Sequence, residues 1–210
     1  GFSEWQKLTI EWIREHYGDT VKVGAGNVVD ADGFRFLAEC GADFIKVGIG
    51  GGSICITRET KGIGRGQATA TIEVAKARDE YYAKTGIYIP ICSDGGIVHD
   101  YHMTLALAMG ADYVMLGQMM AATEEACGDK VKLASGWHRE YYGMSTERAQ
   151  KEMGNTKIKP AEGIEKLVPI EYTVKDWVKE FVRVIESTMS YCNAKFLNQF
   201  IGKVQVQKAS

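Results

Sequence analysis

The sequence predicts an α/β protein built on parallel strands, because short apolar stretches alternate four times with segments of helical periodicity. A second observation supports this fold class. The segments Cys40-Gly-Ala-Asp-Phe44 and Met109-Gly-Ala-Asp-Tyr113 each end a helix at glycine and begin a strand. The third observation is that polar and glycine-rich loops follow the strands, on the face where parallel barrel enzymes keep their active sites. We therefore expect functional groups at the carboxyl ends of the strands.

The expected elements are defined by periodicity and by the residues that start and stop them. A capping box of Ser3 and Gln6 opens a first helix that ends before Gly18, and Asp30 caps the second helix. The first helix has one apolar face, formed by Trp5, Leu8, Trp12 and Ile13. The expected strands are 21–26, 42–50, 87–93 and 112–116, and the next helices are 33–40, 68–84 and 101–109.

Periodicity fades between residues 121 and 169, where the chain becomes a long polar insertion. Irregular segments of this length are uncommon unless they act as lids or are disordered, and we interpret this one as a lid. A last amphipathic helix follows. Its inward side chains should be Val174, Trp177, Val178, Phe181 and Ile185. Residues 196–210 form a tail.

The composition suits one domain in a reducing compartment. The chain has 210 residues, 45% hydrophobic and 25% charged, which allows a sizeable core. A net charge of -2 without a basic stripe argues against nucleic acid, and no apolar run is long enough for a membrane span. The five cysteines lack CxxC spacing, so neither a disulfide framework nor a zinc site is indicated. We expect a cytoplasmic or peroxisome-like location and, because the start lacks methionine, a fragment.

The most informative feature is a thiol in a glycine-rich loop after the second strand. This segment, here named the cysteine loop, reads Gly50-Gly-Gly-Ser-Ile-Cys-Ile-Thr-Arg58. Its small residues allow close backbone approach to a ligand, and its N–H groups or carbonyls can hold a phosphate or a cation. A free cysteine is commonly a small buried hydrophobe. Among glycines and close to the cation of Arg58, however, the Cys55 thiol is better interpreted as a nucleophile.

Further motifs follow the cysteine loop in a characteristic order. They are Gly62-Ile-Gly64, Gln67, Ser93-Asp-Gly-Gly96, Met115-Leu-Gly117 and Tyr142-Gly-Met144. Over nearly the whole chain this set resembles the inosine monophosphate dehydrogenase and guanosine monophosphate reductase family. The resemblance implies a (β/α)8 TIM barrel, of which residues 1–210 supply roughly the second half, strands 5 to 8, and a homotetramer. Half a barrel leaves open sheet edges, so the chain alone should be inactive.

The resemblance also implies roles for individual residues. Cys55 attacks carbon 2 of a purine mononucleotide, GMP or IMP, and hydride is then exchanged with a nicotinamide cofactor. Thr57 and Glu125 match residues that assist proton transfer. The matching substrate contacts are Ser53, Gly96, Gly117, Gln118 and Tyr141 at the phosphate, Asp94 at the ribose, and Gly143, Met144 and Ser145 at the base. Asn27 and Arg58 match positions near the nicotinamide, and the carbonyls of Gly50, Gly52 and Cys55 resemble a potassium site.

These assignments have structural alternatives. Asp94 can start a turn, while Ser53 and Thr57 can satisfy loop N–H groups. Met144 can fill a core, Tyr141 can pack against Tyr142, and a glycine loop can turn without an ion. For the whole protein, the alternatives are a non-catalytic nucleotide-binding or assembly fragment and a flavin-binding barrel. A flavin barrel needs no loop thiol, so the Cys55 motif argues against it.

The family's two reactions differ in how the covalent adduct is resolved. The dehydrogenase, which converts IMP and NAD to XMP, hydrolyses the adduct with an Arg-Tyr pair on the lid, and this chain contains no Arg-Tyr dipeptide. Its lid instead reads Tyr142-Gly-Met-Ser-Thr-Glu147, close to the reductase, which uses NADPH and must protonate departing ammonia. Ile56 and residues 58–67 resemble a protozoan dehydrogenase branch. We expect a GMP reductase, with IMP dehydrogenase as the alternative.

Overall fold

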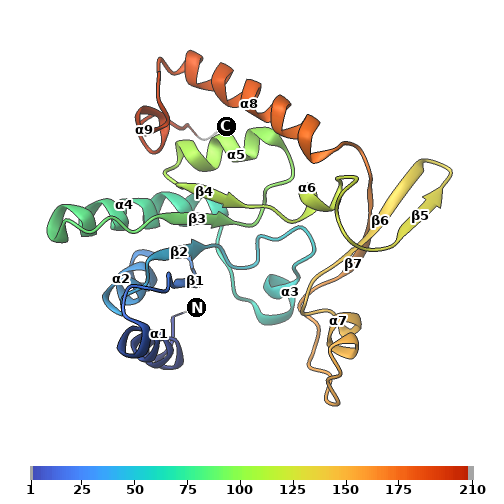
Figure 1. Cartoon of the computed structure of the whole chain (residues 1–210), viewed down its shortest axis with the longest axis horizontal. Coiled ribbons are helices and arrows are strands. Elements are labelled where there is room, and N and C mark those ends of the chain that lie inside the picture. The colour runs from blue at the N-terminus through green and yellow to red at the C-terminus, as the bar shows by residue number, and fades with distance from the viewer. Residues whose placement is uncertain (1, 208–210) are drawn as a thin grey trace.

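A parallel sheet lies at the centre of the fold. The computed structural model describes residues 2–207 and contains a four-stranded parallel sheet with the order β1-β2-β3-β4 (Figure 1). Its strands are β1 (Gly24–Val28), β2 (Phe44–Val47), β3 (Ile91–Asp94) and β4 (Tyr113–Met115). The predicted α/β class with parallel strands is confirmed. Each strand begins later than expected, partly because Asp43 and Asp112 are used in junction contacts before β2 and β4.

Helices cover one face of this sheet. They are α1 (Glu4–Tyr17), α2 (Ala31–Glu39), α4 (Gln67–Thr85) and α5 (Asp100–Ala108). Helix α2 packs against β1, β2 and α4, α4 packs against β2 and β3, and α5 packs against β4. The core between these layers contains the fully buried side chains of Phe34, Leu37, Ile45, Val47 and Ile91. Burial of these apolar side chains is the main stabilising contribution in this half of the molecule.

The opposite face of the sheet is open. Tyr113 is 39% exposed and Met115 43% exposed, and the Phe44 ring meets the Tyr113 ring edge-on with centroids 6.3 Å apart. Strands β1 and β4 form the two edges of the sheet. Because successive strand residues point to opposite faces, the residues that alternate with the buried core face outward here. Adjoining exposed apolar side chains of this kind indicate a surface on which another element packs.

An arginine clamp fixes the junction before β4. Arg78, from α4, donates to Gly110 O at 2.7 Å and pairs with the Asp112 carboxylate at 2.8 Å. The same carboxylate accepts the N–H of Ile91, at the start of the neighbouring strand β3, at 2.8 Å. Gly110 has a φ of +105°, which favours glycine at this helix end. The clamp therefore ties a helix, a helix stop and two strands together.

The same arrangement occurs before β2. Arg14, from α1, donates to Gly41 O at 2.7 Å and pairs with Asp43, whose carboxylate accepts the N–H of Val23 at 2.6 Å. Gly41 has a φ of +95°. The two Gly-Ala-Asp segments thus form the same structure, in which an arginine binds both the glycine carbonyl and the aspartate carboxylate.

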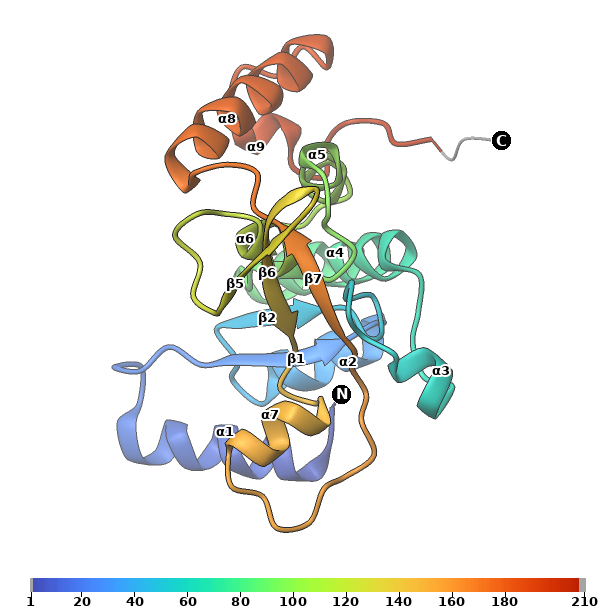
Figure 2. The same ribbon diagram turned by 90° about the vertical axis from the view of Figure 1, so that its right-hand side faces the viewer.

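The lid contains a second sheet. Its antiparallel strands β5 (Lys130–Leu133), β6 (Gly136–Tyr142) and β7 (Glu165–Pro169) pair in the order β5-β6-β7, and short helices α6 (Gln118–Ala121) and α7 (Glu147–Glu152) flank them. Figure 1 shows this sheet beside the parallel sheet, and Figure 2 shows β6 and β7 crossing in front of it. The expectation of an irregular polar loop over 121–169 was wrong, because these strands are mostly exposed and carry little apolar periodicity.

Helix α8 (Val174–Tyr191) and the tail close the fold. Trp177 and Phe181 pack against the core as expected, but Val178 is 43% exposed and no residue of α8 is fully buried. The tail contains a short helix, α9 (Leu197–Phe200), whose Phe200 is buried. Residues 208–210 of the expected tail lie outside the described range. Over residues 2–207, neither α8 nor any other helix is both long and apolar enough to cross a membrane.

One expectation for α1 needs correction. Ser3 Oγ accepts the Gln6 N–H at 3.4 Å, but the Gln6 side chain donates to Gly26 O at 2.7 Å instead of completing the capping box. Most of the apolar face points outward, with Trp5 80% exposed and Trp12 51% exposed, while Ile13 packs against the core near the buried Ile10. Amphipathic spacing identified the face but not what covers it.

Asp43 carries a pH-dependent part of the stability. Burial alone raises the pKa of Asp43, but hydrogen bonds from Val23 N–H and Arg14 outweigh it and hold the pKa below its usual value. The ionised form therefore stabilises the fold above about pH 4, and this stabilisation is lost as the pH falls through the lower pKa of the folded state. We expect Asp43→Asn to reduce the free energy of unfolding by about 1–3 kcal/mol at pH 7.

Urea unfolding at pH 7 and pH 3 measures this effect. The matched control is Asp32→Asn, whose side chain is 87% exposed and should contribute little at either pH. A loss in Asp43→Asn that is equal at both pH values contradicts the assignment.

Candidate active site

The candidate site lies where the carboxyl ends of the parallel strands meet the lid. The cysteine loop follows β2, Asp94 ends β3, and Gly117 follows β4. From the lid, the segment that leads into β7 returns to the cysteine loop, where Cys55 and Gly163 form an isolated antiparallel bridge. Residues more than a hundred positions apart in sequence therefore share one site.

Glycines allow the loops after β2 and β3 to touch backbone to backbone. A Cβ atom on Gly48 would lie 2.0 Å from Asp94 O, and one on Gly95 would lie 2.9 Å from the carbonyl carbon of Gly51. Gly96, with a φ of +77°, then turns the chain away toward α5. A side chain at Gly48 or Gly95 would push the loops apart, so these glycines hold Asp94 beside the cysteine loop.

Asp94 belongs to a small polar cluster. Its carboxylate pairs with Lys46 Nζ at 2.8 Å and accepts a hydrogen bond from Asn27 Nδ2 at 2.9 Å. Asn27 Nδ2 also donates to Gly48 O at 2.7 Å, which ties this side chain to the loop after β2. The sequence analysis missed Lys46. The available signal was a single charged residue in the otherwise apolar strand β2.

The cysteine loop is paired with the lid through its backbone. Ile56 N–H donates to Glu162 O at 2.9 Å, and Ile164 N–H donates to Ile54 O at 2.9 Å. Within the loop, Cys55 N–H donates to Gly52 O at 3.1 Å, which closes a tight turn. This pairing fixes the half-buried Cys55 relative to the lid segment 162–164.

A hydrogen-bonded relay leads away from the thiol. Cys55 Sγ donates to Thr57 Oγ1 at 3.1 Å, and Thr57 Oγ1 donates to Glu162 Oε2 at 2.9 Å. The order of donors allows the thiol proton to pass through the hydroxyl to the carboxylate, which leaves a nucleophilic thiolate. Cys92 is different, because burial raises the pKa of this thiol to about 11. Of these two thiols, Cys55 is the candidate nucleophile, because it has a hydrogen-bonded path to a carboxylate.

Glu162, not Glu125, is the carboxylate that reaches this relay. The Glu125 carboxylate accepts the N–H of Val174 at 3.0 Å, at the start of α8, and so acts at a helix terminus. The sequence analysis missed Glu162 because it lies 105 residues from Thr57 and no local pattern marks it.

Two polar side chains of the lid sheet, Tyr141 and Lys166, contact the loops that carry Ser53 and Gly117. A Cβ atom on Gly117 would come within 2.3 Å of the Tyr141 hydroxyl, so this contact requires glycine. Burial raises the pKa of Tyr141, while Ser53 opposes that shift; the net rise keeps the hydroxyl protonated and able to donate. Lys166, a residue that the sequence analysis missed, places its Nζ 2.5 Å from Gln118 Oε1 and 3.4 Å from Ser53 O. The structure thus brings together four of the five expected phosphate residues.

Of the three expected base contacts, Gly143 lies at the cysteine loop and Ser145 lies at the lid segment that pairs with this loop. A Cβ atom on Gly143 would meet Ile54 Cδ1 at 3.3 Å, and Ser145 O accepts the Glu162 N–H at 3.3 Å. Met144 is 71% exposed, which rules out the alternative that it fills a core.

Arg58 braces the cysteine loop. A Cβ atom on Gly50 would lie 2.6 Å from Arg58 Cγ, and Arg58 Nη2 donates to Arg65 O at 2.6 Å. This side chain is therefore folded over its own loop in the structure. Across residues 2–207, no three His, Cys, Asp or Glu side chains are grouped so as to hold a metal ion, so a cation here would depend on backbone carbonyls.

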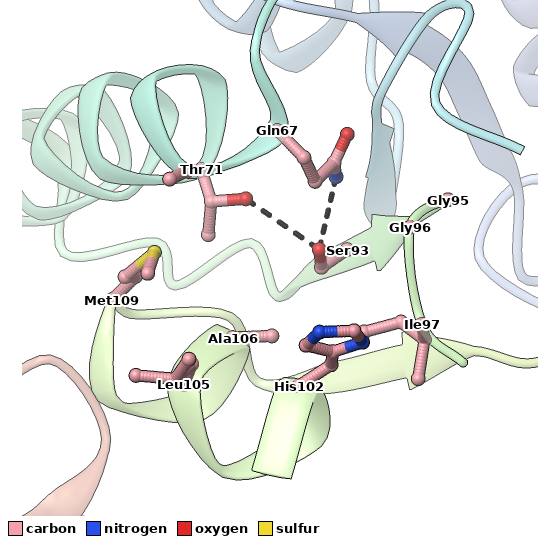
Figure 3. Close-up of a pocket in the computed structure, with 11 residues that line it drawn as sticks. Gln67, Thr71, Ser93, Gly95, Gly96, Ile97, His102, Leu105, Ala106 and Met109 are labelled. Carbon is pink, nitrogen blue, oxygen red and sulfur yellow. Dashed lines mark hydrogen bonds between the residues drawn. The ribbon is translucent and has the colours of Figure 1, made fainter. Parts of the chain in front are cut away.

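A cavity of about 190 Å³ lies behind the site, between α4 and α5 (Figure 3). On its wall, Gln67 Nε2 donates to Ser93 Oγ at 2.9 Å and to Val47 O at 2.8 Å, which holds the ends of β2 and β3 together. His102 Nδ1 accepts the Val98 N–H at 3.2 Å. Burial, and then the nearby His99, lower the pKa of His102, which favours the neutral ring that this hydrogen bond needs. The cavity wall therefore supports the loop that carries Asp94.

Comparison with known proteins gives a consistent result. The family model described as "IMP dehydrogenase / GMP reductase domain" matches residues 1–210. An inosine-5'-monophosphate dehydrogenase of Tritrichomonas foetus is 55% identical, with 100% of this chain and 43% of that protein covered. An inosine-5'-monophosphate dehydrogenase of Aquifex aeolicus is 38% identical, covering 98% and 42%. A GMP reductase of Aliivibrio fischeri is 35% identical, covering 95% and 56%.

The chain therefore spans only about half, or less, of the length of these relatives. Its match to the family model nevertheless extends from the first residue to the last, and it includes the thiol, the glycine loops and the lid. The chain belongs to the IMP dehydrogenase and GMP reductase family.

Proposed function

We propose that this chain forms strands 5 to 8 of a (β/α)8 barrel and acts, within the complete enzyme, as a GMP reductase. The main support is the relay from Cys55 through Thr57 to Glu162, which can both release a thiolate and return a proton to a leaving group. The four parallel strands, their two free edges and the open apolar face support the barrel proposal.

The proposed reaction assigns one step to each of these groups. The Cys55 proton passes through Thr57 to Glu162, and the thiolate sulfur bonds to carbon 2 of GMP. Glu162 returns that proton through Thr57 to the exocyclic nitrogen, whose bond to carbon 2 breaks as ammonia leaves. The nicotinamide cofactor supplies the hydride that carbon 2 receives. The carbon–sulfur bond then breaks, the thiolate is regenerated, and GMP, NADPH and two protons have given IMP, NADP and ammonium.

The lid arginines favour reduction over hydrolysis. Arg139 is 2% exposed and donates to the carbonyls of Thr123, Glu124 and Gly128. Arg148 pairs with three carboxylates, those of Glu140, Glu152 and Glu165, at 2.7, 3.0 and 3.6 Å. Both arginines of the lid are thus engaged away from the thiol. A dehydrogenase needs a lid arginine beside tyrosine to activate water, and this lid does not offer that pair.

IMP dehydrogenase is the second candidate. It is favoured by the 55% identity to the Tritrichomonas foetus dehydrogenase, compared with 35% to the Aliivibrio fischeri reductase. In that case NAD would accept the hydride, and the carbonyls of Gly50, Gly52 and Cys55 would be the donor set for potassium. Gly52 O already accepts a hydrogen bond within the turn, which leaves one lone pair for an ion. For either reaction we propose a homotetramer in a reducing compartment.

The two carboxylates near the ends of the lid provide a direct test of the relay. In the complete enzyme, we expect Glu162→Gln to lower kcat by about 100-fold or more, because a proton acceptor is lost. Glu125→Gln is the matched control and should retain most of the activity, since Glu125 contacts only the α8 terminus. Steady-state kinetics with purified variants measures both. A large loss in Glu125→Gln with little change in Glu162→Gln would reverse the assignment.

The reaction type is tested with paired assays of the complete enzyme. We expect oxidation of NADPH in the presence of GMP, with ammonia released, and no comparable reduction of NAD with IMP. Cys55→Ala should abolish turnover but retain mononucleotide binding, whereas Cys127→Ala, at an exposed cysteine, should leave activity unchanged. Rapid oxidation of IMP without deamination of GMP would establish the dehydrogenase instead.

The barrel proposal predicts that the chain needs a partner segment. Expressed alone, residues 1–210 should turn over neither nucleotide. Co-expression with a segment that supplies the four preceding strand–helix units should restore activity, and the two pieces should copurify through the open sheet face. Full activity of the isolated chain would disprove this arrangement.

A further inference from the structure

Lys166 connects the lid to the parallel-sheet loops. It lies on β7, and its Nζ donates to Gln118 Oε1 at 2.5 Å and to Ser53 O at 3.4 Å. Gln118 begins α6 after β4, and Ser53 lies in the cysteine loop, so one ammonium group contacts both loops from the lid side. These contacts place a positive charge among the residues assigned to phosphate binding.

The charge of Lys166 has no anionic partner over residues 2–207. Its hydrogen-bond acceptors are a neutral amide oxygen and a backbone carbonyl, and burial lowers its pKa. The neighbouring site lysine, Lys46, in contrast pairs with Asp94 at 2.8 Å. A partly buried ammonium without a counter-charge costs free energy, so its retention here indicates that an anion completes the site.

The surroundings match a phosphate group. Lys166 Nζ lies 6.0 Å from the centre of the Tyr141 ring, and the Tyr141 hydroxyl lies against Gly117. The Tyr141 hydroxyl and the Lys166 ammonium of the lid sheet therefore lie against the two loops that carry Gly117 and Ser53. Ammonium groups bind phosphate as point charges, and charge-assisted hydrogen bonds are the stronger class.

We propose that Lys166 binds the phosphate of the purine mononucleotide and thereby links phosphate binding to closure of the lid over the cysteine loop. This proposal rests on the proposed function. The bound phosphate would replace the Gln118 amide oxygen as the main partner of this ammonium. Since β7 follows directly after Gly163 and Glu162, a phosphate held by Lys166 also favours the position in which Glu162 meets Thr57.

The test uses the complete enzyme and three variants. Lys166→Met removes the charge, Lys166→Arg retains it, and Lys132→Met removes an equal charge from the exposed strand β5 of the same sheet. Calorimetry measures the Kd of GMP, IMP and guanosine, which lacks the phosphate. We expect Lys166→Met to weaken both nucleotides by about tenfold or more while guanosine binding stays constant. Lys166→Arg should recover most of the affinity, and Lys132→Met should resemble the wild type.

Additional measurements separate the possible outcomes. Binding of NADPH alone should be unchanged in Lys166→Met, because the proposed anion is the mononucleotide phosphate and not a cofactor phosphate. Equal weakening of guanosine and GMP would indicate a structural role, and weakening of NADPH alone would assign the lysine to the cofactor; either result overturns the proposal. If the wild type binds neither GMP nor IMP, the proposed function itself is wrong. Unchanged nucleotide affinity in Lys166→Met overturns only the role of Lys166.

Discussion

The site depends on the backbone pairing between the cysteine loop and lid residues 162–164. The two hydrogen bonds, from Ile56 to Glu162 and from Ile164 to Ile54, are each 2.9 Å long. They place the Glu162 carboxylate at Thr57, although 105 residues separate the two in sequence. Side-chain reach alone would leave this distance variable, whereas backbone pairing fixes it. Under the proposed function, this segment would supply a reacting group, and its movement away from the cysteine loop would separate the thiol from its proton acceptor.

The parallel sheet positions the loops to which this segment pairs. The arginine clamps tie helix ends to strand starts at the amino ends of β2 and β4. At the opposite ends, Gln67 joins β2 to β3, and the glycine contact at Gly48 sets the spacing of the following loops. These contacts thus fix the strands at their amino ends and at their carboxyl ends. Functional groups on short loops between such fixed points lose little entropy when substrate binds.

Local chemistry explains which features could be predicted from the sequence. Features that depend on residues adjacent in sequence could be predicted. These are the Gly-Ala-Asp junctions, the order of strands along the chain, and the loop that contains Cys55 and Thr57. Glu162 and Lys166 could not be found in this way, because their roles arise from pairing between β7, its preceding segment and distant loops. The antiparallel lid sheet was missed for a related reason: exposed strands contain little apolar alternation. The outward face of α1 shows that periodicity identifies a face but not its partner.

Sequence identity over the whole chain and the contacts of the lid residues bear on different questions: identity on the family, and the lid contacts on the type of reaction. Under the proposed function, both reactions of the family begin with the same thiolate, so the residues around Cys55 serve either one. The identities of 55% to a dehydrogenase and 35% to a reductase are averages over the whole chain, and they show the family to which it belongs. The fate of the adduct depends on whether water is activated at the thiol. In this lid Arg148 pairs with three carboxylates, Arg139 is buried against carbonyls, and Glu162 reaches the relay that begins at Cys55, an arrangement that supports the proposed expulsion of ammonia.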